Sequence, residues 1–151
     1  MKLSVHGSRT LRDERVEILL REEIQKYNIN QIVTHAEPDG VCKVARTLCK
    51  TLAIPLTLHF LNFKYLRGAF EHRSKAVLQD SDRAIFIHDG QSKGTSNELA
   101  LARKKGMKHT YHKLDIAEHD VSVGFPIDKE WELDADELDA GLLTIDIQEE
   151  K

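Results

Sequence analysis

The sequence predicts an α/β fold in three layers, with helices on both faces of a five-stranded, mostly parallel sheet. Three observations support this prediction. Five short apolar runs alternate with four amphipathic segments, which is the pattern of successive βαβ units. Glycine and proline residues stand where helices should end. The chain has 151 residues, of which 40% are hydrophobic, so it is long enough to bury one core.

The predicted strands are the apolar runs at residues 3–6, 32–35, 56–60, 84–88 and 107–112. Parallel strands joined by right-handed crossovers allow few topologies, and we expect the order 3-2-1-4-5. In this order the chain reverses direction between the first and the fourth strand. The loops after these two strands should therefore open into one crevice at the carboxyl edge of the sheet.

The first two helices follow from the spacing of their apolar residues. Thr10, with Asp13 three residues later, is a start signal for the first helix. Its apolar stripe is Val16, Leu19, Leu20, Ile24 and Tyr27. The stripe of the second helix is Val41, Val44, Ala45, Leu48 and Leu52. Pro55 should end this helix before the third strand.

The other two predicted helices cover residues 70–79 and 96–105. In the third helix, Phe70, Val77 and Leu78 are the residues expected to point inward. The fourth helix should end at Gly106, after a run of basic residues that suits the negative end of a helix dipole. Together the segments account for residues 1–114, which we expect to form one domain.

The loops after the first and fourth strands have the composition of phosphate-binding turns. In the first loop, Gly7 permits a tight turn, Ser8 offers a hydroxyl and Arg9 can donate two hydrogen bonds. The second loop is rich in small and hydroxyl-bearing residues: Asp89, Gly90, Ser92, Gly94, Thr95 and Ser96. This loop leads into a helix, whose unpaired N–H groups and positive dipole end attract anions.

Both loops also have a purely structural explanation. A turn from strand to helix often uses glycine and serine for backbone reasons alone. Thr95, with Glu98 three residues later, has the spacing of a capping box, which would give Glu98 about 1 kcal/mol of helix stabilisation and no chemistry.

Four segments, in order, match a known family of nucleotide-binding domains. They are Gly-Ser-Arg at residues 7–9, Gly-Ala-Phe-Glu-His-Arg-Ser-Lys at 68–75, Asp82 before the fourth strand, and Asp-Gly-Gln-Ser-Lys-Gly-Thr-Ser-Asn-Glu at 89–98. Over residues 1–114 the chain resembles the SLOG superfamily of Rossmann-like domains, in particular its small YspA-like members. The resemblance implies binding of nucleotides or nucleotide sugars, including NAD-derived and ADP-ribose-like ligands.

The resemblance extends more distantly to an enzymatic branch, the Lonely Guy phosphoribohydrolases. There an arginine and the glutamate of Gly-Thr-x-x-Glu support cleavage of a base from a ribose 5′-monophosphate. Arg73 and Glu98 look like these two residues. Glu98 would act on the ribose or the attacking water, and Arg73 would hold the phosphate or orient Glu98. This chain lacks the Pro-Gly-Gly of that branch and has a longer, more polar loop at residues 88–93.

The loop after the second strand offers two more carboxylates, Glu37 and Asp39, beside Gly40. At the start of a helix these carboxylates are favoured by the dipole, and they can accept hydrogen bonds from ribose hydroxyls. The alternative is that Asp39 simply caps the second helix.

The sequence predicts neither a metal site nor a cofactor. His109 and His112 would face opposite sides of a strand, so they do not form a ligand pair. Three other histidines end strands and can line the floor of the crevice: His6, His35 and His88. Cys42 and Cys49 have the spacing of ordinary reduced thiols. The basic residues are spread over all helices without a DNA-reading helix, so nucleic acid is not an expected partner.

The net charge of −3 conceals two regions of opposite sign, since residues 1–114 carry +8 and residues 115–151 carry −11. We expect this acidic extension, with Trp131 and an apolar run at 142–147, to pack on the domain or on the partner subunit of a homodimer. The alternative is a tail that serves solubility. No apolar run reaches the roughly 18 residues of a membrane span, and the N-terminus lacks a signal-peptide core. We therefore expect a cytoplasmic protein without membrane contact.

Three functions are compatible with the sequence. The first is binding of a nucleotide or nucleotide sugar by a sensor, carrier or sequestering protein. The second is hydrolysis of a nucleotide N-glycosidic bond with Glu98 and Arg73 as catalytic residues. The third is an interaction protein whose pocket is vestigial.

Overall fold

A computed structural model describes residues 1–61, 63–116 and 143–146 of the chain. The strands form one parallel sheet in the order β5-β4-β1-β2-β3-β6. Their bounds are β1 Lys2–Gly7, β2 Gln31–His35, β3 Leu56–His59, β4 Arg83–His88, β5 His109–Lys113 and β6 Leu143–Asp146. The α/β class and the order 3-2-1-4-5 of the first five strands are confirmed, and β6 extends the sheet beyond β3.

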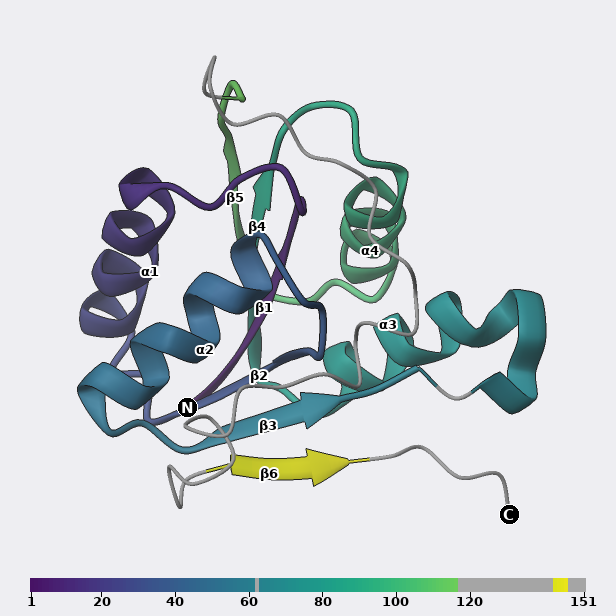
Figure 1. Ribbon diagram of the computed structural model, residues 1–151, viewed down its shortest axis with the longest axis horizontal. Helices are drawn as coiled ribbons and strands as arrows, with labels where there is room; N and C mark the ends of the chain where they lie inside the picture. The colour runs from purple at the N-terminus through teal and green to yellow at the C-terminus, as the bar shows by residue number, and fades with distance from the viewer. Residues whose placement is uncertain (62, 117–142, 147–151) are drawn as a thin grey trace.

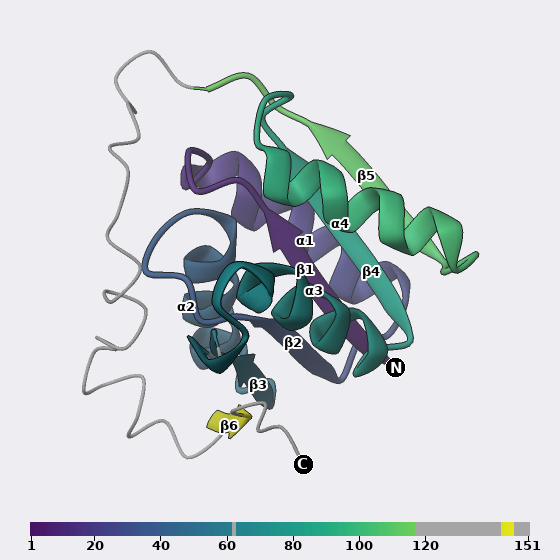
Figure 2. The same cartoon turned by 90° about the vertical axis from the view of Figure 1, so that its right-hand side faces the viewer.

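Two helices lie on each face of the sheet (Figures 1 and 2). Helices α1 (Glu14–Lys26) and α2 (Val41–Leu52) cover one face, and α3 (Ala69–Gln79) and α4 (Lys93–Lys104) cover the other. A short 3-10 helix, Phe63–Gly68, precedes α3. None of the described helices is long and apolar enough to cross a membrane.

The core lies on both sides of the central strands, as expected for a parallel sheet whose two faces are both covered by helices. Val5, Ile85 and Ile87 pack with the apolar residues of α1 and α2 in one cluster. On the opposite face, Phe86 packs with Leu99 of α4. The end of β1 lies very close to the start of α2, because a Cβ atom on Gly7 would be 2.4 Å from the Cβ atom of Val41. This close approach holds the end of β1 against the start of α2 at the carboxyl edge of the sheet.

Several boundaries differ from the sequence predictions. Helix α1 begins at Glu14 and not near Thr10, because Asp13 is the N-cap and accepts a hydrogen bond from the N–H of Arg15. Helix α4 begins at Lys93, before the predicted residue 96, with Ser92 as N-cap. The inward orientation predicted for Phe70 is wrong, since this residue is 42% exposed. Helix α4 ends at Lys104, one residue before the predicted end, and Gly106 follows in the left-handed region with a φ of 66°.

The apolar run at 142–147 overlaps β6, which pairs in parallel with β3 of the same chain. Trp131 and most of the acidic extension lie outside the described residues. The domain boundary at residue 114 and the packing of the extension therefore remain predictions.

Candidate functional site

A pocket of about 400 Å³ opens at the carboxyl edge of the sheet, between the loop after β1 and the start of α4. Among the described residues it is lined by Gly7, Ser8, Arg9, Thr10, Glu37, Phe70, Ser92, Gly94, Thr95 and Glu98. The loops after the first and fourth strands therefore lie on one pocket, as the strand order predicts. We call it the edge pocket.

Ser8 and Asp89 tie the two loops together. The Ser8 hydroxyl accepts a hydrogen bond from the N–H of Asp89 at 3.0 Å, and the Ser8 N–H donates to the carbonyl of Ile87 at 3.1 Å. The Asp89 carboxylate accepts hydrogen bonds from the Thr10 hydroxyl, the N–H groups of Gln91 and Ser92, and the Ser92 hydroxyl. Burial by itself would raise the pKa of Asp89, but these hydrogen bonds outweigh it and lower the pKa to about 2. Asp89 shapes the loop and is not part of the pocket lining.

The start of α4 lines the edge pocket with Gly94 and Thr95. Its N-cap, Ser92, makes no side-chain capping bond, and the hydroxyl of Ser92 donates to Asp89. The first turn contains no acidic residue and begins with Lys93. A Cβ atom on Gly94 would meet no atom within 4 Å, so a ligand can approach the main chain there. The first helical turn is therefore suited to an anion.

The capping box predicted for Thr95 and Glu98 is wrong, since the helix begins at Lys93 and Glu98 lies in its second turn. Glu98 is instead held by two histidines. His6 Nδ1 and His35 Nε2 contact the same carboxylate oxygen, Oε2 of Glu98, the latter at 2.7 Å. We call these three residues the His–His–Glu cluster. Their potential ligand atoms lie within 4.8 Å of one another, which makes them a candidate metal-binding group in the described part of the chain.

The charges within the His–His–Glu cluster follow from its burial. Burial raises the pKa of Glu98, but the attraction of His35 and His6 and their hydrogen bonds outweigh it and hold the pKa well below its ordinary value. Burial is the largest cause that lowers the pKa of His35, and Arg73 adds to it. At neutral pH Glu98 is therefore a carboxylate, and Nε2 of His35 carries the hydrogen that faces it, because a carboxylate only accepts hydrogen bonds.

Arg73 is not among the residues that line the edge pocket. Its side chain is buried, and its Nη2 atom is 3.4 Å from Oε1 of Glu37. The other oxygen of Glu37 accepts a hydrogen bond from Nε of Arg9 at 2.9 Å. Glu37 therefore links Arg73 to the pocket wall. The roles that the resemblance implied for Arg73, holding a phosphate or orienting Glu98, remain predictions.

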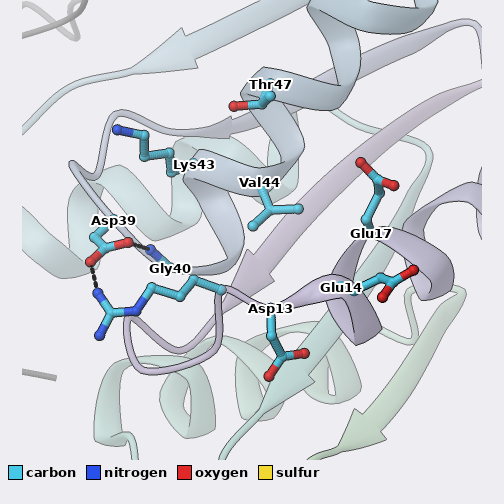
Figure 3. Close-up of a pocket in the computed structure, with 9 residues that line it drawn as sticks. Asp13, Glu14, Glu17, Asp39, Gly40, Lys43, Val44 and Thr47 are labelled. Carbon is cyan, nitrogen blue, oxygen red and sulfur yellow. Dashed lines mark hydrogen bonds and ion pairs between the residues drawn. The ribbon is translucent and has the colours of Figure 1, made fainter. Parts of the chain in front are cut away.

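Asp39 and Gly40 lie on a different pocket, between the starts of α1 and α2 (Figure 3). Asp39 accepts a hydrogen bond from the N–H of Gly40 at 2.7 Å and forms an ion pair with Arg12. Gly40, with a φ of 83°, is the N-cap of α2, so Asp39 does not cap this helix. Glu37 and Asp39, both expected to be able to accept hydrogen bonds from ribose hydroxyls, line separate pockets.

The remaining predicted residues have structural partners outside the edge pocket lining. Gly90 has a φ of 86° and faces the side chain of Lys113. The Ser96 hydroxyl contacts the Ser92 carbonyl and Nε2 of His88. His88 also contacts the hydroxyl of Tyr111 at 3.0 Å, and it is not grouped with the other two strand-end histidines.

Two lining residues, Thr10 and Phe70, are not predicted by the sequence, and neither is the meeting of His6 and His35 with Glu98. Val5 pairs with Thr34 in the register of β1 and β2, so His6 and His35 are the next neighbours along these strands. This register is the signal that could have placed the two histidines side by side. Their contact with Glu98 depends on how α4 crosses the sheet, which sequence spacing does not reveal.

Neither a family model nor a curated protein matches the chain. Among solved structures, it is similar to the Moco carrier protein from Chlamydomonas reinhardtii, with a TM-score of 0.57 and 17% sequence identity. The match covers 95% of this chain and 87% of that chain. At this identity the similarity concerns the fold alone, and it agrees with the sheet order described above. The chain therefore has a Rossmann-like α/β fold.

Proposed function

We propose that this protein binds a phosphorylated small molecule, of the nucleotide or nucleotide-sugar class, in the edge pocket. It would act as a sensor, carrier or sequestering protein for that molecule. The proposal rests on one observation: the loop after β1 and the uncapped, acid-free start of α4 line the same pocket. Backbone N–H groups at such a helix start bind phosphate oxygens well.

The shape of the edge pocket supports a ligand larger than inorganic phosphate. Its volume of about 400 Å³ lies within the roughly 300–1,000 Å³ of small-molecule sites. Phe70, 42% exposed, offers an apolar face to a base or another planar group. Glu37 is anchored by Arg9 and is placed to accept hydrogen bonds from hydroxyl groups of a sugar.

Two similarities support the proposal from outside the structure. The motifs at residues 7–9, 68–75 and 89–98 resemble those of SLOG domains, which implies an ADP-ribose-like or NAD-derived ligand. The solved structure with a similar fold is named a carrier protein, which makes carriage of a small molecule one form that the function can take here.

The test introduces one negative charge at the predicted phosphate position. Gly94→Asp places a carboxylate at the start of α4, where the helix dipole favours it, so the fold should keep its stability. The matched control is Asn97→Asp, which adds the same charge on the exposed side of α4, at another pocket. ADP-ribose, NAD and nucleoside monophosphates are titrated by calorimetry. We expect Gly94→Asp to weaken binding at least roughly tenfold, or about 1.4 kcal/mol, and Asn97→Asp to change it little.

Equal affinities of the two variants would contradict the placement of the phosphate. If no compound of this panel binds the unmodified protein, the nucleotide proposal fails and the vestigial pocket is favoured. Arg9→Gln is a second variant for the same titration, because Arg9 lies on the pocket wall. Ser8→Ala is less suitable, since it would leave the N–H of Asp89 without its hydroxyl acceptor.

A second candidate function, hydrolysis of an N-glycosidic bond, is favoured by the position of Glu98. This carboxylate lies on the pocket wall and remains ionised, so it can accept a hydrogen bond from a ribose hydroxyl or an attacking water. The test is release of the free base from nucleoside 5′-monophosphates, followed by chromatography. Under this hypothesis Glu98→Gln should abolish the release, and an unchanged rate would contradict it.

A further inference from the structure

We propose that the His–His–Glu cluster binds one divalent transition-metal ion, with Zn²⁺ as the ion that its donor set suits best. The ligand atoms would be Nδ1 of His6, Nε2 of His35 and a carboxylate oxygen of Glu98. This inference goes beyond the proposed function, because it concerns binding of the metal alone and needs no nucleotide.

Three different elements bring the ligands together. His6 and His35 occupy neighbouring positions at the carboxyl ends of β1 and β2, so their side chains lie on the same face of the sheet. Helix α4 contributes Glu98, which is 63 residues from His35 in the sequence. Because the ligands come from three elements, they form none of the short spacing motifs by which metal sites are recognised in sequences.

The separation of the donor atoms suits a tetrahedral ion. Nδ1 of His6 and Nε2 of His35 are 3.4 Å apart, and both atoms contact Oε2 of Glu98. Two nitrogen ligands, each about 2.0–2.1 Å from Zn²⁺ and separated by a tetrahedral angle, lie roughly 3.3–3.4 Å from each other. The imidazole rings therefore need little movement to accept an ion between them.

The surroundings hold the two imidazole rings in this orientation. Nε2 of His6 is 2.9 Å from the Ser4 hydroxyl, the kind of outer partner that fixes a ligating histidine. The ring of His6 also stacks on Phe86, with centroids 4.7 Å apart. His35 directs Nε2 into the cluster, although its buried Nδ1 has no hydrogen-bond partner among the described residues.

The donor atoms of the cluster, and its position beside the edge pocket, suit an ion with one exchangeable ligand. Two imidazoles and one carboxylate form the same donor set as that of several catalytic zinc sites, in which a fourth position stays open. Glu98 lies on the wall of the edge pocket, so an ion can reach the cluster from this pocket. The fourth position can then be filled by water or by a donor atom of a molecule bound there.

The experiment measures metal binding by the full-length protein. The protein is treated with a chelator, dialysed and titrated calorimetrically with Zn²⁺ in the absence of nucleotide. We expect one ion per chain for the unmodified protein. Glu98→Gln and His35→Asn should each weaken binding at least roughly tenfold. The matched control is His112→Gln, a histidine of β5 outside the cluster, which should leave binding unchanged.

A second readout separates ligation from a merely structural role. Co²⁺ bound at the cluster should give the visible absorption of a nitrogen-and-oxygen-ligated ion, and Glu98→Gln should change that spectrum. Circular dichroism shows whether each variant is folded, and two ligand variants are used so that one remains if the other fails to fold. Absence of Zn²⁺ binding by the unmodified protein, or equal binding by Glu98→Gln and His112→Gln, would overturn the proposal. The cluster would then be a hydrogen-bonded triad only.

Discussion

At the residue scale, the Asp89 carboxylate stabilises the loop between β4 and α4. Its oxygens accept hydrogen bonds from Thr10, Gln91 and Ser92, and its pKa falls from 3.8 to about 2. A carboxylate whose pKa is lower in the folded than in the unfolded protein stabilises the fold above the unfolded pKa. This stabilisation, about 2 kcal/mol for such a shift, is lost as the pH falls from about 4 through 2.

We therefore expect Asp89→Asn to lower the free energy of unfolding by about 1–2 kcal/mol at pH 7. An amide keeps one acceptor oxygen but loses the charge. The difference from the unmodified protein should shrink between pH 4 and pH 2, because the unmodified carboxylate becomes protonated in that range. Urea unfolding at pH 7, 4 and 2.5 measures it, with Glu22→Gln at an exposed position as the control. A difference that stays constant with pH would contradict this role.

The sequence predicted which residues surround the pocket better than it predicted what their side chains do. Ser8, Arg9, Gly94 and Glu98 line the pocket because they follow the first and fourth strands, and strand order can be derived from the sequence pattern. The partners of Glu98 could not be derived in this way. A spacing of three residues from Thr95 fits a capping box, but a helix start displaced to Lys93 removes that geometry.

At the element scale, a buried ionic cluster fastens α1 to β4 and β5. Oε2 of Glu23 accepts hydrogen bonds from Nε of Arg83 and from the Thr110 hydroxyl, both at 2.9 Å. The Arg83 guanidinium also lies 3.6 Å from the centroid of the Tyr27 ring. Glu23 and Arg83 are both buried. Removal of one partner would leave the other charge buried and uncompensated.

We expect Glu23→Ala to lower the free energy of unfolding by about 3–5 kcal/mol, which is typical of a broken buried ion pair. The control is Glu22→Ala, the exposed neighbour on the same helix, which should change it by less than about 0.5 kcal/mol. Chemical denaturation of both variants under one set of conditions gives the comparison. Similar values for the two variants would show that α1 is held by its apolar stripe alone.

The elements themselves were predictable because each follows one strong local pattern. Helix α2 spans the predicted apolar stripe from Val41 to Leu52 and ends before Pro55. Strand β4 is buried along its whole length. The errors occur where a tertiary contact replaces a local one. Thr10 has the sequence of a helix start, but its hydroxyl donates to Asp89, 79 residues away, and α1 is capped by Asp13.

At the scale of the whole molecule, charge and sheet edges determine what can associate. Residues 1–114 carry +8 and residues 115–151 carry −11, so the two regions attract each other within a chain or between chains. The homodimer expected from the sequence remains a prediction. Sedimentation equilibrium at low and high salt measures it: a dimer that dissociates in salt would support contact between oppositely charged regions, and a monomer under both conditions would contradict it.

The pairing of β6 with β3 leads to the last prediction. A strand at the edge of a sheet exposes unpaired N–H and C=O groups, and β6 covers those of β3 with Thr144 in register with Thr57. Thr144→Pro removes one N–H group and disfavours a strand, so the amides of β3 should exchange with solvent hydrogen faster, while those of β1 should not change. Thr144→Val preserves strand propensity and serves as the control. Unchanged exchange in β3 of Thr144→Pro would show that this edge is protected without β6.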